Sequence, residues 1–176
     1  ILAANVMAHI SDLHEVAEGI LRLLKRKGVL IFEAVYLGDM IKQTAYDLIY
    51  DEHVYTFSVR AVAGIFADHG LDLIDVKPLS THGGSMRYVL AHKGQRPVSA
   101  AVAEQLAVEE AQGLYLPKTY EQFRLRCETM RDRLLSILEH AKQQGRRVAG
   151  YGASAKSTTV LNYCGIGPEL IEFICD

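Results

Sequence analysis

The sequence has no tryptophan, only four prolines and only three cysteines among its 176 residues. The cysteines (Cys127, Cys164 and Cys175) are widely separated, and none has the Cys-x-x-Cys spacing that is typical of zinc and redox sites. A disulfide scaffold and a cysteine-based metal centre are therefore not indicated. We expect three reduced cysteines in the core of a cytoplasmic protein that holds no metal.

Charge of a single sign and long apolar runs are also absent. The 19 basic and 21 acidic residues leave a net charge of -2, with no long block of lysine and arginine. Because nucleic-acid binding depends on a basic patch, we expect no nucleic-acid partner. No apolar run approaches the roughly 20 residues that a membrane-spanning helix needs, so we expect no membrane association.

The first part of the chain, residues 1–94, alternates between strand and helix and predicts an α/β fold. A nearly apolar strand over Ile1–Ile10 is followed by Ser11 as a helix N-cap, an amphipathic helix and a buried strand over Val29–Val35. This order is typical of a parallel βαβ unit.

An irregular stretch then leads to a predicted helix over residues 58–69. Two further strands are expected over residues 71–79 and 86–91. Their short link contains two glycines, which predicts an antiparallel hairpin at the edge of the sheet.

The rest of the chain predicts a helical connector over residues 95–145 and one more βαβ unit over residues 146–176. The apolar stripes of the connector indicate packing surface, so we assign it no chemistry. The last unit is expected to consist of strand 146–149, helix 156–163 and strand 170–175. Because an apolar strand stands at each end of the sequence, we expect the chain to be an internal piece of a longer protein.

The densest group of reactive side chains is Tyr50-Asp-Glu52-His53-Val-Tyr55. If this segment is helical, Tyr50 and His53 share a face. A histidine beside a carboxylate can act as a base near neutral pH, and a tyrosine can donate to a developing oxyanion. From residue types alone, a solvated polar loop with one structural histidine is an equally good interpretation.

His9 falls at the predicted carboxyl end of the first strand, where ligands bind in open α/β sheets. Glu33 and Tyr36, near the end of the next strand, have similar standing. For each of them a packing or capping role is the alternative. We expect the remaining candidates of this type to be separate surface residues: His14, His69, His92 and His140.

Two glycine motifs could approach a ligand. His82-Gly83-Gly84-Ser-Met-Arg87 permits close backbone contact but also makes an ordinary hairpin turn. Gly150-Tyr-Gly152-Ala-Ser-Ala-Lys156 fits the G-x-G-x-x-G/A phosphate-binding turn, and Asp176 stands roughly where a ribose-binding acid is expected. Taken alone, the second motif predicts a nicotinamide-dinucleotide enzyme.

In their order and spacing, five motifs resemble those of the sugar C-methyltransferases, in particular the S-adenosylmethionine-dependent C-3' methyltransferases of dTDP-4-keto deoxysugars. The motifs are Asn5-Val-Met-Ala-His9-Ile, Tyr36-Leu-Gly-Asp39, Tyr50-Asp-Glu-His53, His82-Gly-Gly-Ser-Met-Arg87 and Gly150-Tyr-Gly-Ala-Ser-Ala-Lys156.

The resemblance implies three parts in a complete enzyme: an N-terminal zinc-binding domain, a central Rossmann-like class I methyltransferase domain, and a C-terminal α/β domain that helps to hold the nucleotide sugar. Residues 1–94 would be the second half of the central domain. Residues 95–145 would be the connector, and residues 146–176 would be the first βαβ of a second Rossmann-like domain. The zinc cysteines and the glycine-rich cofactor loop are missing, so we expect this chain alone to be inactive.

The resemblance also implies roles in a reaction that passes through an enolate. His53 would be the base, Glu52 its orienter or a ligand of a sugar hydroxyl, and Tyr50 and His9 the groups around the enolate oxygen; His9 as the base stays open. Asn5 is a candidate contact to S-adenosylmethionine. The substrate, a nucleotide-diphosphate sugar of the dTDP type, would be bound by Gly83, Gly84, Arg87, Gly150, Gly152 and Lys156.

Two other functions remain open at this point. An NAD(P)-dependent oxidoreductase built on the Gly150 turn would leave the Tyr50–His53 cluster unexplained. A non-catalytic remnant or binding module is the other alternative, because the sequence carries only half of a cofactor site.

Overall fold

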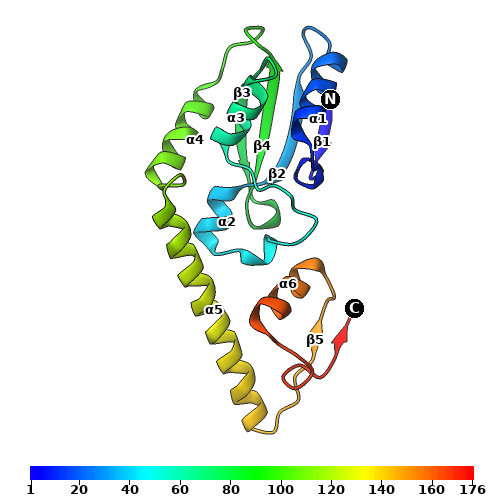
Figure 1. Cartoon of the computed structure of the whole chain (residues 1–176), viewed down its shortest axis with the longest axis vertical. Helices are drawn as coiled ribbons and strands as arrows, with labels where there is room; N and C mark the ends of the chain where they lie inside the picture. Colours follow the sequence, from blue (N-terminus) through cyan, green and yellow to red (C-terminus); the bar gives the residue numbers. More distant parts are fainter. The chain divides into compact units, whose positions relative to one another are not determined.

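The computed structural model describes all 176 residues and divides into two compact units (Figure 1). The first unit comprises Ile1–Gln43 and Glu52–Leu116, and the second comprises Thr44–Asp51 and Pro117–Asp176. The chain has a mixed α/β fold, with a four-stranded sheet and a separate small parallel pair of strands. The three-part division of the sequence at residues 94 and 145 stays a prediction.

The first unit is built on a sheet with the strand order β1-β2-β4-β3. β1 (Leu2–Ala4) pairs in parallel with β2 (Leu30–Val35). β4 (Ser85–His92) pairs antiparallel with both β2 and β3 (Leu71–Leu79). The predicted parallel pair and the predicted hairpin are both confirmed, and β3 forms one edge of the sheet.

The helices of the first unit are α1 (Leu13–Leu23), α2 (Leu37–Gln43), α3 (Val59–Ala67) and α4 (Ala100–Ala111). Asp12, and not the predicted Ser11, caps α1, because its carboxylate accepts the N–H of Glu15 at 2.9 Å. Ser58 caps α3 by accepting the N–H of Ala61 at 3.1 Å, so the helix begins one residue later than predicted. The segment after β2, which we expected to be irregular, contains α2.

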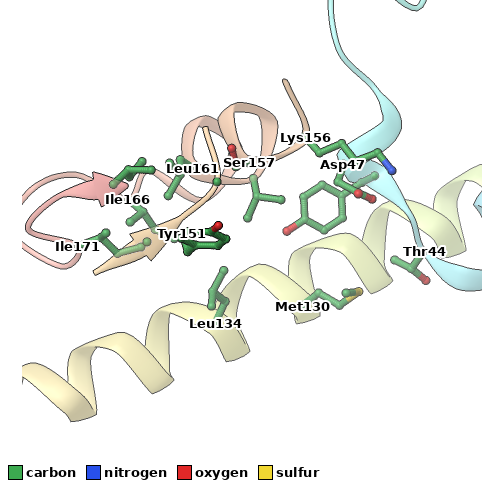
Figure 2. Close-up of a pocket in the computed structure, with 15 residues that line it drawn as sticks. Thr44, Asp47, Met130, Leu134, Tyr151, Lys156, Ser157, Leu161, Ile166 and Ile171 are labelled. Atoms are coloured by element: carbon green, nitrogen blue, oxygen red, sulfur yellow. The ribbon is translucent and has the colours of Figure 1, made fainter. Parts of the chain in front are cut away.

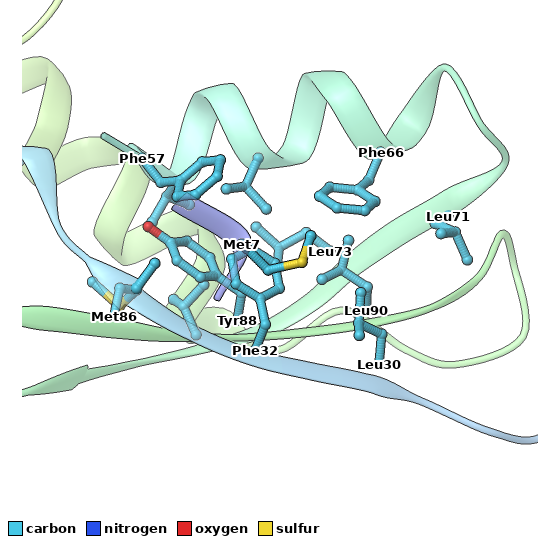
Figure 3. Packing of buried hydrophobic residues seen from close by; sticks show 14 of the residues in the cluster. Met7, Leu30, Phe32, Phe57, Phe66, Leu71, Leu73, Met86, Tyr88 and Leu90 are labelled. Carbon is cyan, nitrogen blue, oxygen red and sulfur yellow. The ribbon is translucent and has the colours of Figure 1, made fainter. Parts of the chain in front are cut away.

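The core of the first unit lies on one face of the sheet (Figure 3). Alternate residues of β2 point into it, so Phe32 is buried while its neighbour Glu33 lies on the opposite face. The Phe32 ring lies 4.7 Å from Tyr88, 5.7 Å from Phe57 and 5.9 Å from Phe66, measured between centroids. These contacts connect β2 and β4 to α3 and to the segment that precedes it.

The beginning of the chain differs from the predicted ten-residue buried strand. β1 is only three residues long, and Leu2 is 81% exposed. Asn5 then adopts a left-handed backbone conformation with φ of 53°, which asparagine tolerates better than other residues and which ends the strand. The apolar Met7 and Ala8 are buried instead by a short 3-10 helix, η1 (Met7–His9).

The second unit contains η2 (Tyr46–Leu48), α5 (Pro117–Gln143), β5 (Gly150–Tyr151), α6 (Ala155–Cys164) and β6 (Ile174–Cys175). The parallel pairing of β5 with β6 across α6 confirms the predicted βαβ order. Both strands begin later than we expected. A turn in which Leu170 and Ile171 donate to the Gly167 carbonyl delays β6, and Arg147 pairs with Glu172 at 2.7 Å outside the strands.

All three cysteines are free thiols, as predicted, but only Cys127 and Cys164 are buried. Cys175, which we expected in the core, is exposed because the two-stranded sheet does not cover its side chain. None of the helices is both long enough and apolar enough to cross a membrane.

Candidate active site

The candidate active site lies where β1 and β2 end. Because these strands are parallel, their carboxyl ends meet at one edge of the sheet, which is where ligands bind in open α/β folds. The β3–β4 turn reaches the same edge, since Ser85 at the start of β4 pairs with Val35 at the end of β2. An isolated bridge between Tyr36 and Phe57 adds the segment before α3.

His9 and His53 come together at this edge. Their imidazole rings lie 5.1 Å apart between centroids at an interplanar angle of 63°. His9 is exposed and His53 is half-buried. The two residues that the sequence offered as alternative bases therefore belong to one pair of adjacent rings.

Tyr55 holds the two histidine segments together. Its backbone N–H donates to the carbonyl of Ala8 at 3.2 Å, and its phenol donates to the carbonyl of Ser11 at 2.8 Å. These bonds lie on either side of His9 in the sequence, so they fix the loop that carries it. The sequence showed Tyr55 within the reactive cluster but gave no signal for this role.

Glu52 and Tyr50 are not placed by a helix as we had considered. The chain turns at Asp51 and Glu52 and is then irregular up to α3, so the helical spacing of Tyr50 and His53 does not apply. Glu52 is exposed in the first unit, whereas Tyr50 is half-buried in the second unit. Their catalytic roles stay predictions.

The glycine turn before β4 is shaped by packing. Gly84 has φ of 130°, and a Cβ atom there would lie 2.4 Å from the Cβ of Asp39 in α2. Gln43 donates its side-chain amide to the carbonyl of Gly83. Gly83 also has a positive φ, of 80°, so the backbone conformation explains both glycines, and substrate contact by them stays a prediction.

Asp39 is a titratable residue at this edge that residue types alone did not single out. It lies in the first turn of α2, directly beside Gly84. Burial raises the pKa of its carboxyl above the ordinary value, and the nearby Lys42 opposes that shift. Its place between β2 and the glycine turn could have been found from the Tyr36-Leu-Gly-Asp motif only together with the fold.

Arg87, Glu33 and Tyr36 already have partners within the first unit. The Arg87 guanidinium bonds the Glu33 carboxylate at 2.7 Å and 2.6 Å across β2 and β4. This pair lines a cavity of about 310 Å³ on the face of the sheet away from the core. Tyr36 is buried, donating to Glu109 and accepting from Gln105, each at 3.0 Å, so its phenol is not at hand for a substrate.

Two histidines that we expected to be separate also converge, outside the candidate site. His14 Nδ1 lies 2.7 Å from His69 Nε2, joining α1 to the end of α3. His92 bonds the carbonyl of Leu24 at 2.9 Å, and His140 bonds Gln144 at 2.7 Å. No group of three or more His, Cys, Asp or Glu side chains is arranged to hold a metal ion.

The Gly150 motif forms the turn between β5 and α6 of the second unit. Gly152 has φ of 97°, and Ser154 caps α6 by accepting the N–H of Ser157. The N–H of Ala153 donates to the Asp176 carboxylate at 3.0 Å, so the acid that we predicted to bind ribose holds the turn itself.

A cavity of about 410 Å³ opens beside this turn (Figure 2). Lys156 and Asp47 lie at one end of it, and Ile166 and Ile171 lie at the other. The remaining lining is mostly apolar and comes from α5, α6, the two strands, and Thr44 and Tyr46 at the start of η2. Such a site can hold a flat or apolar group together with an anion near Lys156.

The sequence was compared with known proteins. Residues 80–176 match the family described as the C-methyltransferase C-terminal domain. The chain is 37% identical over 170 residues to the C-methyltransferase NovU of Streptomyces niveus. The match covers 96% of this chain and 40% of NovU, so the chain spans less than half the length of this relative.

Proposed function

Because the chain belongs to the C-methyltransferase C-terminal domain family, we propose that it is part of an S-adenosylmethionine-dependent enzyme that methylates a carbon of a nucleotide-linked 4-keto deoxysugar. In this proposal the first unit is part of a Rossmann-like methyltransferase domain and carries the base. The second unit begins the domain that holds the nucleotide part of the substrate.

The observation that carries the proposal is the His9–His53 pair at the carboxyl edge of β1 and β2. A keto group makes the neighbouring C–H acidic, so an imidazole base can remove that proton and leave an enolate. The proton stays on the imidazole and the electron pair of the broken C–H bond stays on the enolate. Bound S-adenosylmethionine would then methylate the enolate carbon, with its sulfur–methyl bond broken and S-adenosylhomocysteine released. Two adjacent imidazoles suit this task, because one can take the proton and the other can donate to the enolate oxygen.

We assign the proton transfer to His53 and the supporting contact to His9. His53 is the more buried of the two, and partial removal from water strengthens its interaction with a developing charge. The exposed His9 is held at both sides by Tyr55 and can keep its ring against His53 during the reaction.

S-adenosylmethionine, when bound, would supply the methyl group. Asn5 is the one residue of this chain that we place near it, at the end of β1, where its left-handed backbone ends the strand. The first unit has no glycine-rich turn between a buried strand and a helix of the kind that holds such a cofactor. These residues therefore do not form the cofactor site by themselves.

The experiment that tests this function follows loss of deuterium from the sugar carbon next to the keto group in the full-length protein. With the methyl donor left out, His53→Ala should stop the exchange, and in the complete reaction it should lower kcat by about 10²–10⁴-fold with KM nearly unchanged. His9→Ala should slow the reaction less. His140→Ala, an exposed histidine on α5 of the second unit, is the matched control and should change neither.

Three outcomes would change the proposal. If His9→Ala stops the exchange and His53→Ala does not, the two roles are reversed. If neither substitution affects exchange, the histidine pair is not the base. If the unsubstituted full-length protein neither exchanges deuterium nor transfers a methyl group to any 4-keto sugar nucleotide, the chain belongs to a binding module.

A further inference from the structure

A buried carboxylate outside the candidate active site organises the segment that carries His53. Glu109 lies on α4 and is completely buried. Its Oε1 accepts the N–H of Val59 at 2.5 Å and the hydroxyl of Tyr36 at 3.0 Å, and its Oε2 accepts the N–H of Arg60 at 3.1 Å. The Tyr115 hydroxyl donates to Oε2 as well.

These four donors explain how a carboxylate can lie in the core. A buried charged group is costly unless hydrogen bonds replace its hydration, and both oxygens of Glu109 are satisfied. Val59, Arg60 and Ala61 supply the first N–H groups of α3, which have no partner inside the helix. Ser58 accepts the N–H of Ala61, and Glu109 accepts the other two. Glu109, which lies 50 positions after Val59 in the sequence, therefore completes the N-terminal cap of α3.

Glu109 also fixes the end of β2 through Tyr36. The Tyr36 phenol bridges Glu109 and Gln105, and its backbone N–H donates to the carbonyl of Gly84 at 3.2 Å. The next residue, Leu37, donates to the carbonyl of Phe57 at 2.8 Å. The Glu109 side chain therefore joins the end of β2 to the start of α3, and the Tyr36 backbone adds the glycine turn.

His53 lies between this anchor and the Tyr55 bonds. Only the residues from Val54 to Ser58 separate His53 from α3, and Phe57 among them is buried in the core. Tyr55 attaches the same stretch to the loop of His9. A change at the α3 cap therefore moves the stretch that sets the distance between the two imidazole rings.

We propose that Glu109 is a positioning residue that holds His53 against His9 by fixing the start of α3 and the end of β2. Its kinetic consequence rests on the proposed function, whereas its effect on the histidine pair does not. The connector, to which the sequence assigned no chemistry, would thereby control the geometry of the site.

The test compares Glu109→Gln with Glu109→Asp in the full-length protein. Glutamine has nearly the same shape as glutamate, but it replaces one acceptor oxygen by an NH₂ group. That group would face N–H or O–H donors that now bond to the carboxylate. Aspartate keeps two acceptor oxygens on a shorter side chain and should restore part of what glutamine loses. We expect Glu109→Gln to lower kcat about 10- to 100-fold with KM changed less than about twofold, because the loss is one of alignment.

A readout that does not depend on activity is the nuclear Overhauser contact between the ring protons of His9 and His53, measured by NMR. The unsubstituted protein should show this contact, because the two ring centroids lie 5.1 Å apart, and Glu109→Gln should weaken or abolish it. The amide protons of Val59 and Arg60 should exchange with solvent at least about tenfold faster.

Two controls separate positioning from stability. Tyr88→Phe removes a buried hydroxyl that has no hydrogen-bond partner, and Leu90→Ala weakens the core on β4 next to Leu30, at the start of β2. Neither should separate the two histidine rings. If Leu90→Ala, at a loss of stability equal to that of Glu109→Gln, weakens the ring contact as much, the positioning role is overturned. If Glu109→Gln separates the rings but the unsubstituted protein has no methyl-transfer or exchange activity, the positioning role holds and the proposed function fails.

Discussion

The two units of the chain bury their apolar residues to different extents. In the first unit Leu30, Phe32, Tyr88 and Leu90 are fully removed from solvent. In the second unit the best-buried apolar side chains, such as Leu48, Phe123 and Leu138, keep between 3% and 9% of their surface exposed. The four-stranded sheet has one face covered by helices, whereas a two-stranded sheet beside one long helix cannot enclose a comparable core.

This difference in burial is consistent with the role that we propose for each unit. A base must be held within a fraction of an ångström of its target, and the dense core of the first unit supports such a site. A binding cavity needs accessible apolar walls, and the second unit leaves Tyr151 93% and Ile174 43% exposed, with both residues lining the Gly150 cavity. The densely buried core lies in the unit that carries the histidine pair, and exposed apolar surface lies beside the Gly150 turn.

The largest expected effect is the contrast between two phenylalanine substitutions. Phe32→Ala should cost the first unit about 3–5 kcal/mol, because the ring is fully buried among three aromatic side chains and its loss leaves a cavity. Phe123→Ala on α5 should cost the second unit about half as much, since this residue is 9% exposed and borders an open cavity.

Urea unfolding followed by a probe in each unit measures both values. Equal losses from the two substitutions would show that the second unit is packed as densely as the first, and would contradict the contrast in burial.

The apolar periodicity of the sequence predicted most of the strands and helices. It failed where one apolar run is divided between two different elements. The helix predicted over residues 58–69 corresponds to α3, and the glycine-containing link predicted the hairpin of β3 and β4. At the N-terminus the apolar run combines an exposed strand with a buried 3-10 helix, and no periodicity separates these two. Asn5, which makes the break, is recognised only from its backbone conformation.

The candidate site was predictable in its parts but not in its assembly. The sequence named His9 and His53 as alternatives, and only the fold shows that they form a pair. Glu109 gave no signal, because an acidic residue on a helix usually lies on the solvated face. Long-range pairing of a side chain with a helix terminus depends on tertiary structure, which no local pattern contains.

A smaller effect is expected from the charge beside the Gly150 turn. Lys156→Ala should weaken binding of a dTDP-sugar by about tenfold, because it removes one charge-assisted contact near the N-terminus of α6. Binding of S-adenosylmethionine should stay nearly unchanged. The matched control is Lys142→Ala, which changes an exposed lysine in the last turn of α5. Isothermal titration calorimetry of the full-length protein measures the affinities for the dTDP-sugar, S-adenosylmethionine and a third ligand, NADH.

The third ligand is NADH, which tests the dinucleotide interpretation of the same turn. If NADH binds more tightly than dTDP and Lys156→Ala weakens NADH more, the second unit belongs to an oxidoreductase. The engagement of Asp176 with Ala153 favours the sugar nucleotide, since an acid that holds the turn is less available to a ribose hydroxyl.

The smallest expected effect concerns two buried tyrosines, one in each unit. The hydroxyl of Tyr88 has no hydrogen-bond partner, and burial raises its pKa well above the ordinary value, so its polar atom is a cost to the first unit. Tyr88→Phe keeps the stacking on Phe32 and should leave stability unchanged or raise it by up to about 1 kcal/mol. Tyr46→Phe in the second unit should instead lower stability by up to about 1 kcal/mol. The Tyr46 hydroxyl lies 3.7 Å from the Cys164 sulfur, and the substitution removes this weak hydrogen bond. The urea midpoints of the two variants measure both changes in stability. A clear loss of stability in Tyr88→Phe would mean that the Tyr88 hydroxyl contributes to the hydrogen bonds around Glu109, and would make Tyr88 a member of the network that holds α3.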